Sequence, residues 1–355
     1  MGILAENKYF KIMKKVCFIT GINGQDGCFL AKIAIENGYE VIGTQRRLPN
    51  IKSKQIINGL IELGIYEKIK FEITELEKLE NVEELVKKYK PTFLIHLASQ
   101  SSIEKSTKYK HLTYTSNTLI SKNIIDSVEK YSKDTALFFP SSATIFEGYN
   151  NIIVNEETKA KPLSNYAISK YNTQKYIDQK ISESNLILKT GIMFSHESEY
   201  RRDNFFSKKI IKFLTKYKNG NKESLSVGDI SIKRDIGYAP EYSDAIFKIL
   251  LLDNSEKFIV SSNTLYKLSD FIEFSLDYLQ ISYEVLYEDK LIKYIDTSTG
   301  KTFIESDIRK FRTHDLRNIQ GDNSRLITAT GWKPKLKLED ICKKMIDHNL
   351  KAELQ

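Results

Sequence analysis

Cysteine, proline and long apolar runs are scarce in this sequence, and each shortage excludes a class of protein. The 355 residues include 3 Cys, 6 Pro and 1 Trp. Cys17, Cys28 and Cys342 show neither metal-ligand nor disulfide spacing, so we expect reduced thiols in a cytoplasmic protein without a metal site. No apolar stretch approaches the ~20 residues of a membrane span. Residues 1–14 lack a signal-peptide core and are predicted to form a short extension.

The charge balance is moderately basic. Lysine and arginine number 54 against 46 aspartate and glutamate residues, which gives a net charge of +8. Such an excess can attract a polyanion. The lysines are scattered without interleaved aromatic residues, however, which favours a solvated surface over nucleic-acid binding. A small substrate that carries phosphate would also suit this charge.

A strand, a glycine-rich turn and a helix follow one another near the N-terminus. Residues 15–20 form a short apolar run, residues 21–27 read GINGQDG, and a helical pattern comes next. This is the context that a dinucleotide-binding fingerprint requires. Gly21 would allow the tight turn, Gly24 would let the backbone approach a pyrophosphate, and Gly27 would let helix and strand pack closely. The diphosphate would lie at the helix N-terminus.

The end of the second predicted strand, residues 39–45, bears on the choice of cofactor. An acidic residue there would bind the 2′-hydroxyl of a ribose and select NAD, whereas arginine accommodates a 2′-phosphate. The strand is followed by Arg46 and Arg47. We therefore expect NADP rather than NAD. A solvated basic turn is the alternative interpretation of the two arginines.

Strands and helices alternate through the first half of the chain. Strands are expected over residues 15–20, 39–45, 69–73, 92–98, 136–140 and 185–190, with helices over 82–90, 112–131 and from the region of Tyr166 to about 184. This order predicts an α/β fold with a doubly wound, right-handed parallel Rossmann sheet. His96 lies within an apolar run and is expected to be a core or strand-end histidine.

The alternation loosens beyond Gly191. We expect a smaller, mixed C-terminal part, with a loop over 193–202, helices over 205–218 and 243–252, a short strand over 224–227 and a further sheet strand over 258–261. The remainder is expected to contain short helices, a turn at 331–334 and a final helix. The chain is therefore divided into the extension 1–14, an NADP-binding Rossmann domain 15–190, and a part, 191–355, that mainly binds substrate while some of its segments return to the sheet. Arginines of the last part are candidates for binding a diphosphate.

One Tyr-x-x-x-Lys pair is a candidate catalytic centre. Tyr166 and Lys170 are four residues apart on a predicted helix, so their side chains share a face. The ammonium of Lys170 is expected to lower the pKa of the phenol, which could then accept the proton of a substrate alcohol while hydride passes to the cofactor. Ser142, at the end of a strand, would complete the site. Because the chain has 20 Tyr, the pair alone could arise by chance.

With these parts in this order, the chain resembles the extended short-chain dehydrogenase/reductases, and within them the GDP-mannose 4,6-dehydratase family. The resemblance runs from Lys15 to Asn349. It is carried by residues 20–27, 45–47, 100–101, 191–198 with Arg201 and Arg202, 234–238, 311–315, 321–322 and 331–334. The stretch from Gly191 to Tyr238 is the most specific, and it lies in the part expected to bind substrate.

The resemblance implies a set of site residues. For the cofactor they are Gly21, Asn23, Gly24, Gln25, Asp26, Gly27, Arg46, Arg47, Glu72, Ile73, Leu97, Ala98, Ser99, Tyr166 and Lys170. For a GDP-sugar substrate they are Ser101, Thr190, Ser195, Lys209, Arg234, Arg312 and Asp315. The catalytic set is Ser142, Thr144, Tyr166 and Lys170. The resemblance also implies a homodimer, or a homotetramer assembled around Arg46 and Arg47, and a role in polysaccharide biosynthesis.

Two residues depart from the family pattern. Where the family has a glutamate that moves protons during water loss, this chain has Thr144, and the stretch Ser-Ser-Ala-Thr resembles nucleotide-sugar 4-epimerases instead. A threonine hydroxyl does not titrate near neutral pH, and losing a positioned acid/base costs ~10²–10⁴-fold in rate. Thr190 replaces an asparagine of the family. Glu147 is near the missing glutamate in sequence, but would need a shifted strand end to reach the site.

These observations predict an NADP-dependent enzyme that oxidises C4 of a GDP-linked hexose or heptose, with 4-epimerisation or simple oxidoreduction favoured over dehydration. One alternative is a true GDP-mannose 4,6-dehydratase with a displaced acid/base. Another, from a different class, is a non-catalytic NADP-binding scaffold.

Overall fold

The computed structural model describes residues 15–46, 58–101, 106, 108–289, 291–312 and 317–353. Within these residues, seven strands form one sheet in the order β11-β7-β5-β4-β1-β2-β3, and every neighbouring pair is parallel. The strands are β1 (Val16–Thr20), β2 (Glu40–Gln45), β3 (Ile69–Ile73), β4 (Phe93–His96), β5 (Ala136–Ser142), β7 (Ile187–Met193) and β11 (Glu256–Val260). The predicted parallel Rossmann sheet is confirmed, including its last strand.

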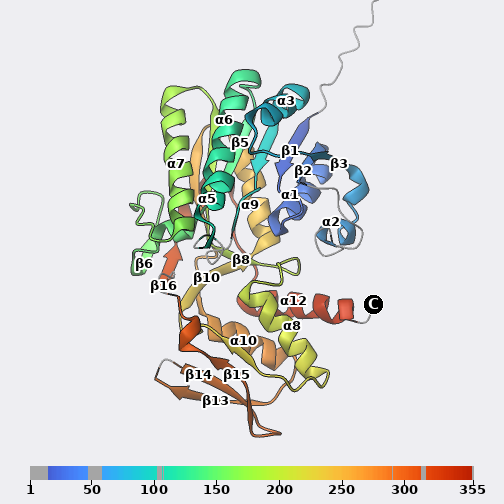
Figure 1. Cartoon of the computed structure of the whole chain (residues 1–355), viewed down its shortest axis with the longest axis vertical. Coiled ribbons are helices and arrows are strands. Elements are labelled where there is room, and N and C mark those ends of the chain that lie inside the picture. Colours follow the sequence, from blue (N-terminus) through green and yellow to red (C-terminus); the bar gives the residue numbers. More distant parts are fainter. Residues whose placement is uncertain are drawn as a thin grey trace, which may run out of the picture.

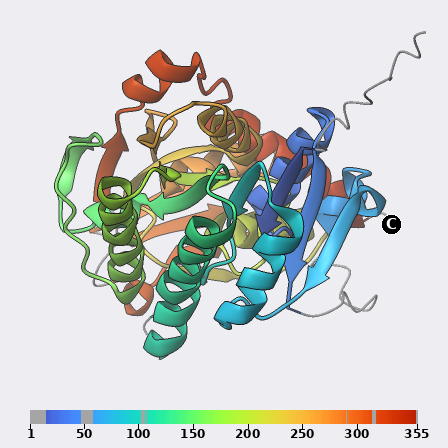
Figure 2. The same cartoon turned by 90° about the horizontal axis from the view of Figure 1, so that it is seen from above.

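Helices cover both faces of this sheet (Figures 1 and 2). One face packs on α1 (Gln25–Glu36) and α9 (Ala239–Leu250), and the other on α3 (Leu79–Tyr89), α6 (Ile120–Tyr131) and α7 (Asn165–Glu183). Both faces of each central strand are therefore buried, which explains why those strands are continuous apolar runs rather than alternating ones. The short helices of this half are α2 (Asn58–Glu62), η2 (Tyr66–Lys68), α5 (Lys110–Tyr114), η3 (Thr115–Leu119) and η4 (Ala143–Phe146).

The lower part of Figure 1 has a second apolar core. It is built by α8 (Phe206–Lys218), α10 (Leu268–Tyr278), α12 (Leu338–Glu353) and the sheet of β13 (Tyr283–Glu288), β14 (Leu291–Asp296), β15 (Lys301–Ser306) and β9 (Leu225–Val227). The predicted helix over 205–218 is confirmed as α8, whereas the prediction of short helices beyond residue 261 missed the strands β13 to β15. β14 alternates half-buried and buried residues, as a strand with one covered face does, so it lacks the continuous apolar run of a central strand.

Two smaller sheets accompany the Rossmann sheet and the sheet of the second core. β8 (Ser195–Glu197), β10 (Lys233–Tyr238) and β12 (Leu265–Lys267) form one small sheet, and β6 (Asn150–Val154) pairs with β16 (Arg317–Gly321). The remaining elements are α11 (Ser324–Thr330) and η5 (Ile308–Lys310). The predicted loop over 193–202 therefore contains a strand, which is short and acquires its partner only from β10, about forty residues later in the chain.

The predicted helix over 112–131 is interrupted. α5 continues into η3, a π-helical turn, and then into α6. Asn117 in this turn is 2% exposed and its side chain bonds to both backbone groups of Gln100 and to Ser169 Oγ. The turn thus ties the loop after β4 to the helix α7.

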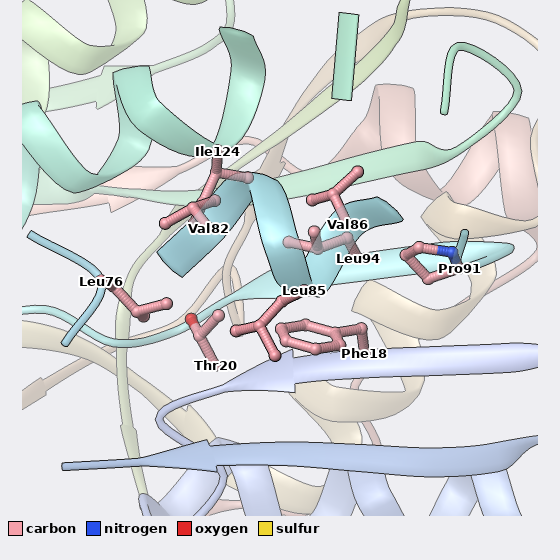
Figure 3. Close-up of a pocket in the computed structure, with 9 residues that line it drawn as sticks. All are labelled: Phe18, Thr20, Leu76, Val82, Leu85, Val86, Pro91, Leu94 and Ile124. Carbon is pink, nitrogen blue, oxygen red and sulfur yellow. The ribbon is translucent and has the colours of Figure 1, made fainter. Parts of the chain in front are cut away.

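A small apolar cavity lies between the sheet and the helices α3 and α6 (Figure 3). Its volume is about 10 Å³. It is lined by Phe18, Thr20, Leu76, Val82, Leu85, Val86, Pro91, Leu94 and Ile124. A space of this size with an apolar lining is a packing defect and holds no substrate.

The three cysteines are buried free thiols. Burial raises the pKa of Cys17 and of Cys342 to about 12, because the thiolate is poorly solvated there. Across the described residues, none of the helices combines the length and the apolar character needed to cross a membrane.

Candidate active site

A cleft of about 290 Å³ opens at the carboxyl ends of β1, β4 and β5, where parallel sheets bind their ligands. The structure brings fourteen of the predicted site residues to this cleft. They are Gly21, Gly24, Gln25, Asp26, Gly27, Leu97, Ala98, Ser99, Ser101, Ser142, Thr144, Tyr166, Lys170 and Ser195. They come from five separate segments, so the fold assembles in one place what the sequence had left dispersed.

Other predicted site residues do not line the cleft. Glu72 accepts hydrogen bonds from Lys88 Nζ, at 2.8 Å, and from the Tyr89 hydroxyl, while Ile73 points to solvent with 47% of its surface exposed. Asn23 and Arg46 bind to side chains described below. Four residues of the predicted substrate set also lie away from the cleft, namely Thr190, Lys209, Arg234 and Arg312. Arg47 and Asp315 lie outside the described residues.

The predicted substrate residues divide by burial. Thr190 is 3% exposed within β7, between Phe139 and Lys257 on the neighbouring strands. A residue in that position contributes to the sheet core rather than to the cleft. Lys209 and Arg312 are exposed, and Arg234 on β10 is half-buried.

The turn after β1 has the shape that a dinucleotide needs. Gly21 has φ +68°, and a Cβ atom there would lie 2.8 Å from the backbone nitrogen of Ala98. A Cβ atom on Gly27 would lie 2.5 Å from the carbonyl oxygen of Ile22, so only glycine allows helix α1 to pack this closely. Gly24 begins α1 without a side-chain cap, which leaves backbone N–H groups at a positive helix end for a phosphate.

Two orphaned polar atoms lie beside this turn. Asn23 Nδ2 donates to Gln45 Oε1 at 2.9 Å, yet Asn23 Oδ1 and Gln45 Nε2 are buried and have no partner among the described residues. One is an acceptor and the other a donor, the pair that a ribose diol can satisfy. The glycine turn and these two atoms together fit a nicotinamide dinucleotide.

Three hydroxyl groups form a chain in the cleft. The Thr144 hydroxyl donates to Ser142 Oγ at 3.0 Å, and the Thr144 backbone N–H donates to the same oxygen at 3.3 Å. Ser142 in turn is hydrogen-bonded to the Tyr166 phenol. Because Ser142 Oγ already accepts twice, its own proton is available for the phenol oxygen.

The predicted effect of Lys170 on Tyr166 is wrong for this arrangement. Burial raises the pKa of the Tyr166 phenol, and the hydrogen bond from Ser142 and the charge of Arg201 only partly offset it. Lys170 Nζ donates to the Pro140 carbonyl at 3.0 Å and lies 6.0 Å from the centre of the phenol ring. Burial lowers the pKa of Lys170 itself to about 8, because the ammonium is poorly solvated.

The sequence interpretation missed a histidine that lines the cleft beside Asp26. His196 Nε2 lies 3.1 Å from a carboxylate oxygen of Asp26, and His196 Nδ1 lies 2.7 Å from the Phe194 carbonyl. Burial alone would lower the pKa of His196, but Asp26 raises it overall. The histidine in return lowers the pKa of Asp26, although burial opposes this. The family-like segment 191–198 was the only sequence signal for this histidine.

Arg201 completes that wall. Its guanidinium stacks on the Phe205 ring at 3.7 Å, and Nε lies 3.1 Å from the Glu197 carboxylate. Both arginine and phenylalanine line the cleft. Arg201 is therefore a fixed positive charge that faces the phenol.

Glu147 is not a relocated acid/base. Its carboxylate accepts from the Leu163 backbone N–H at 2.7 Å and from both the backbone N–H and the hydroxyl of Ser164, the residue that caps α7. The side chain is 5% exposed and does not line the cleft. Glu147 thus anchors the start of the catalytic helix.

Comparisons with known proteins agree with this architecture. A UDP-glucuronic acid 4-epimerase from Bacillus cereus, solved with UDP-glucuronic acid and NAD, superposes with a TM-score of 0.76 at 15% identity over 95% of this chain and 99% of that one. RMD from Pseudomonas aeruginosa, solved with NADPH, gives 0.73 at 19% identity over 96% and 99%.

Sequence relatives define the family. GDP-mannose 4,6 dehydratase 2 of Arabidopsis thaliana is 27% identical over 342 residues, which cover 95% of this chain and 87% of the relative. The fold and the relatives place the protein among the nucleotide-sugar epimerases and dehydratases of the short-chain dehydrogenase/reductase class. The model of the GDP-mannose 4,6 dehydratase family matches residues 18–345, and the chain belongs to this family.

Proposed function

We propose that this protein uses NADP to oxidise C4 of a GDP-linked hexose or heptose, and that the reaction ends in 4-epimerisation or oxidoreduction rather than in loss of water. The observation that carries the proposal is the hydroxyl chain from Thr144 through Ser142 to Tyr166. The Thr144 hydroxyl donates to Ser142, and Ser142 is hydrogen-bonded to the phenol. Thr144 stands where elimination would need a carboxylate.

Tyr166 is the proposed acceptor of the C4 hydroxyl proton. Burial raises the pKa of the Tyr166 phenol, and the hydrogen bond from Ser142 and the positive charge of Arg201 both lower it and so oppose that larger effect. Bound nicotinamide would take the hydride from C4, which leaves a ketone. The Ser142 hydroxyl, which donates to the phenol oxygen, would stabilise the negative charge there until the proton of the substrate arrives. Returning the hydride to the other face of the ketone, with the proton from Tyr166, would give the 4-epimer.

NADP is proposed from Arg46 and Arg47 at the end of β2, because guanidinium groups match phosphate oxygens. We assign substrate binding mainly to residues 191–355. Ser101 and Ser195 line the cleft and would contact the sugar. The cationic residues Lys209, Arg234 and Arg312, with Asp315, would hold the GDP moiety.

A specific observation supports a second candidate, dehydration with a displaced acid/base. Asp26 is the one carboxylate among the described residues that line the cleft, and it is paired with His196. If water is lost from C5 and C6, Asp26 is the carboxylate that the described cleft wall offers. Against the effect of burial, its contact with His196 lowers its pKa, which makes it a weak base.

Product analysis separates the two candidates. The purified protein is incubated with GDP-mannose and NADP, and the nucleotide sugars are examined by mass spectrometry and NMR. We expect an unchanged substrate mass with a new C4 configuration, or a C4 ketone two hydrogens lighter. A 4-keto-6-deoxy product, lighter by one water, would reject the proposal in favour of the dehydratase. Panels of UDP- and CDP-sugars test the choice of base.

We also propose that the protein is a homodimer that pairs through α5, η3 and α7. These elements contact one another and expose large apolar side chains, among them Leu112 at 47% and Ile168 at 41%. Adjacent exposed apolar residues typically mark an interface. Light scattering should give twice the chain mass for the native protein and the chain mass for a Leu112→Asp, Ile168→Asp double variant. Ile308→Asp, 65% exposed on η5, is the control and should stay dimeric.

A further inference from the structure

The end of β2 has an ion pair whose position bears on the choice between NADP and NAD. Arg46 Nη2 donates to Glu77 Oε1 at 2.8 Å. Arg46 is the described residue that we expect to reach a 2′-phosphate, and its side chain is 62% exposed. In this structure the guanidinium is engaged by a carboxylate of the protein itself.

The carboxylate is held on a fixed backbone. Glu77 lies in the turn between β3 and α3, and the Asn123 side chain on α6 donates to the carbonyls of Leu76 and Glu77 at 3.2 Å each. Asn123 and Leu76 are buried, with 8% and 6% of their surfaces exposed. The turn is therefore anchored to the core, and it keeps Glu77 close to the end of β2.

A second carboxylate adds to the negative charge around Arg46. The pKa of Glu75 is lowered mainly by its hydrogen bond to Lys78, and the charge of Arg46 lowers it further. Glu75 lies 2.8 Å from Lys78 Nζ, so its own charge is largely matched by that lysine. Glu77 makes its ion pair with Arg46.

The atoms beside this ion pair carry no charge. Asn23 Oδ1 and Gln45 Nε2, the orphaned buried pair, are amide atoms and neither attracts nor repels a 2′-phosphate by charge. Among the described residues, Arg46 is then the charged group that distinguishes the two cofactors. A 2′-phosphate has to displace Glu77 from the guanidinium and remain near a carboxylate, whereas a 2′-hydroxyl carries no such cost.

We infer that Glu77 sets the cofactor preference of this protein: by pairing with Arg46 it lowers the ratio of NADP to NAD affinity below the value that the arginine alone would give. This inference rests on the proposed dinucleotide site. It assigns to Glu77 a role in specificity, exercised through Arg46 and through repulsion of the phosphate.

Calorimetric titration with NADP⁺ and with NAD⁺ tests the inference on the full-length protein. Glu77→Gln keeps the size of the side chain and removes its charge. We expect the dissociation constant for NADP⁺ to fall about three- to tenfold, the scale of one exposed ion pair together with the lost repulsion, while that for NAD⁺ changes less than about twofold. The gain should shrink as salt is added, because screening weakens the contacts of exposed charges.

Two further variants make the outcome specific. Glu75→Gln removes the neighbouring carboxylate, which pairs with Lys78, and should change the NADP to NAD ratio less than half as much. In an Arg46→Ala background, Glu77→Gln should alter the ratio less than it does in the native protein, since the competition for the guanidinium is gone and only the repulsion of the phosphate remains. An unchanged ratio in Glu77→Gln, or weaker NADP⁺ binding, would overturn the inference. Absence of binding of either dinucleotide to the native protein would instead reject the proposed function.

Discussion

Tyr166→Phe is expected to lower kcat/KM for nucleotide-sugar turnover by roughly 10³-fold, because it removes the group that accepts the C4 proton. Dinucleotide affinity and thermal stability should change little, since the phenol ring and its packing remain. The measurement is the rate of product formation at saturating cofactor, with calorimetric titration of NADP⁺ as the binding readout.

Tyr176→Phe is the matched control for this change. Tyr176 lies on the same helix α7, and its hydroxyl donates to Asp126 rather than to a cleft residue. Its loss should leave the rate within about twofold. A native protein that binds NADP⁺ and turns over no sugar of the GDP, UDP and CDP panel would support the non-catalytic scaffold. Equal rates for Tyr166→Phe and the native enzyme would show that the phenol is not the base.

Thr144→Glu should raise the rate of 4,6-dehydration by about 10²-fold, because it places a titratable carboxylate beside the substrate where the hydroxyl of Thr144 now lies. Thr144 is 7% exposed and lines the cleft, so the new side chain has the substrate within reach. The readout is the water-loss product from GDP-mannose by mass spectrometry. Epimerisation or C4 oxidation should slow at the same time, because Ser142 loses the donor at 3.0 Å that orients it.

Thr144→Gln separates the acid/base effect from the change in shape. Glutamine has nearly the same size as glutamate but cannot take a proton from C5, so it should show the slower oxidation and no gain in dehydration. Equal products from the two variants would mean that the carboxylate is irrelevant. Dehydration by the native protein at the rate of the glutamate variant would show that Thr144 does not limit elimination.

The central fold could be predicted because its signals are local. The apolar runs of β1, β4 and β5 are buried on both faces, and alternation of such runs with helices permits few topologies. Gly27 could be interpreted for the same reason, because its steric constraint, the Ile22 carbonyl oxygen, lies in the same turn. The strands β13 to β15 were missed because exposed or half-buried residues interrupt their apolar positions, so that they lack a continuous apolar run.

The site was predictable only as far as sequence spacing reaches. Tyr166 and Lys170 share a helix face by their four-residue separation, and both line the cleft. The prediction that Lys170 lowers the pKa of Tyr166 was wrong, because burial of the phenol and the hydrogen bond from Lys170 to Pro140 depend on how α7 packs on β5. Glu147, which the sequence placed near the missing glutamate but out of reach of the site, accepts hydrogen bonds at the start of α7 instead.

The sequence by itself determined the parallel sheet, the glycine turn and the replacement of the family glutamate by Thr144, since each depends on residue type within a short window. Tertiary structure alone decided that His196 meets Asp26 across 170 residues of chain and that Arg46 forms an ion pair with Glu77. The physical reason is that ion pairs and proton affinities depend on distance and burial. Distance and burial are both set by packing between segments that are far apart in the sequence, and no local pattern predicts which of these segments meet.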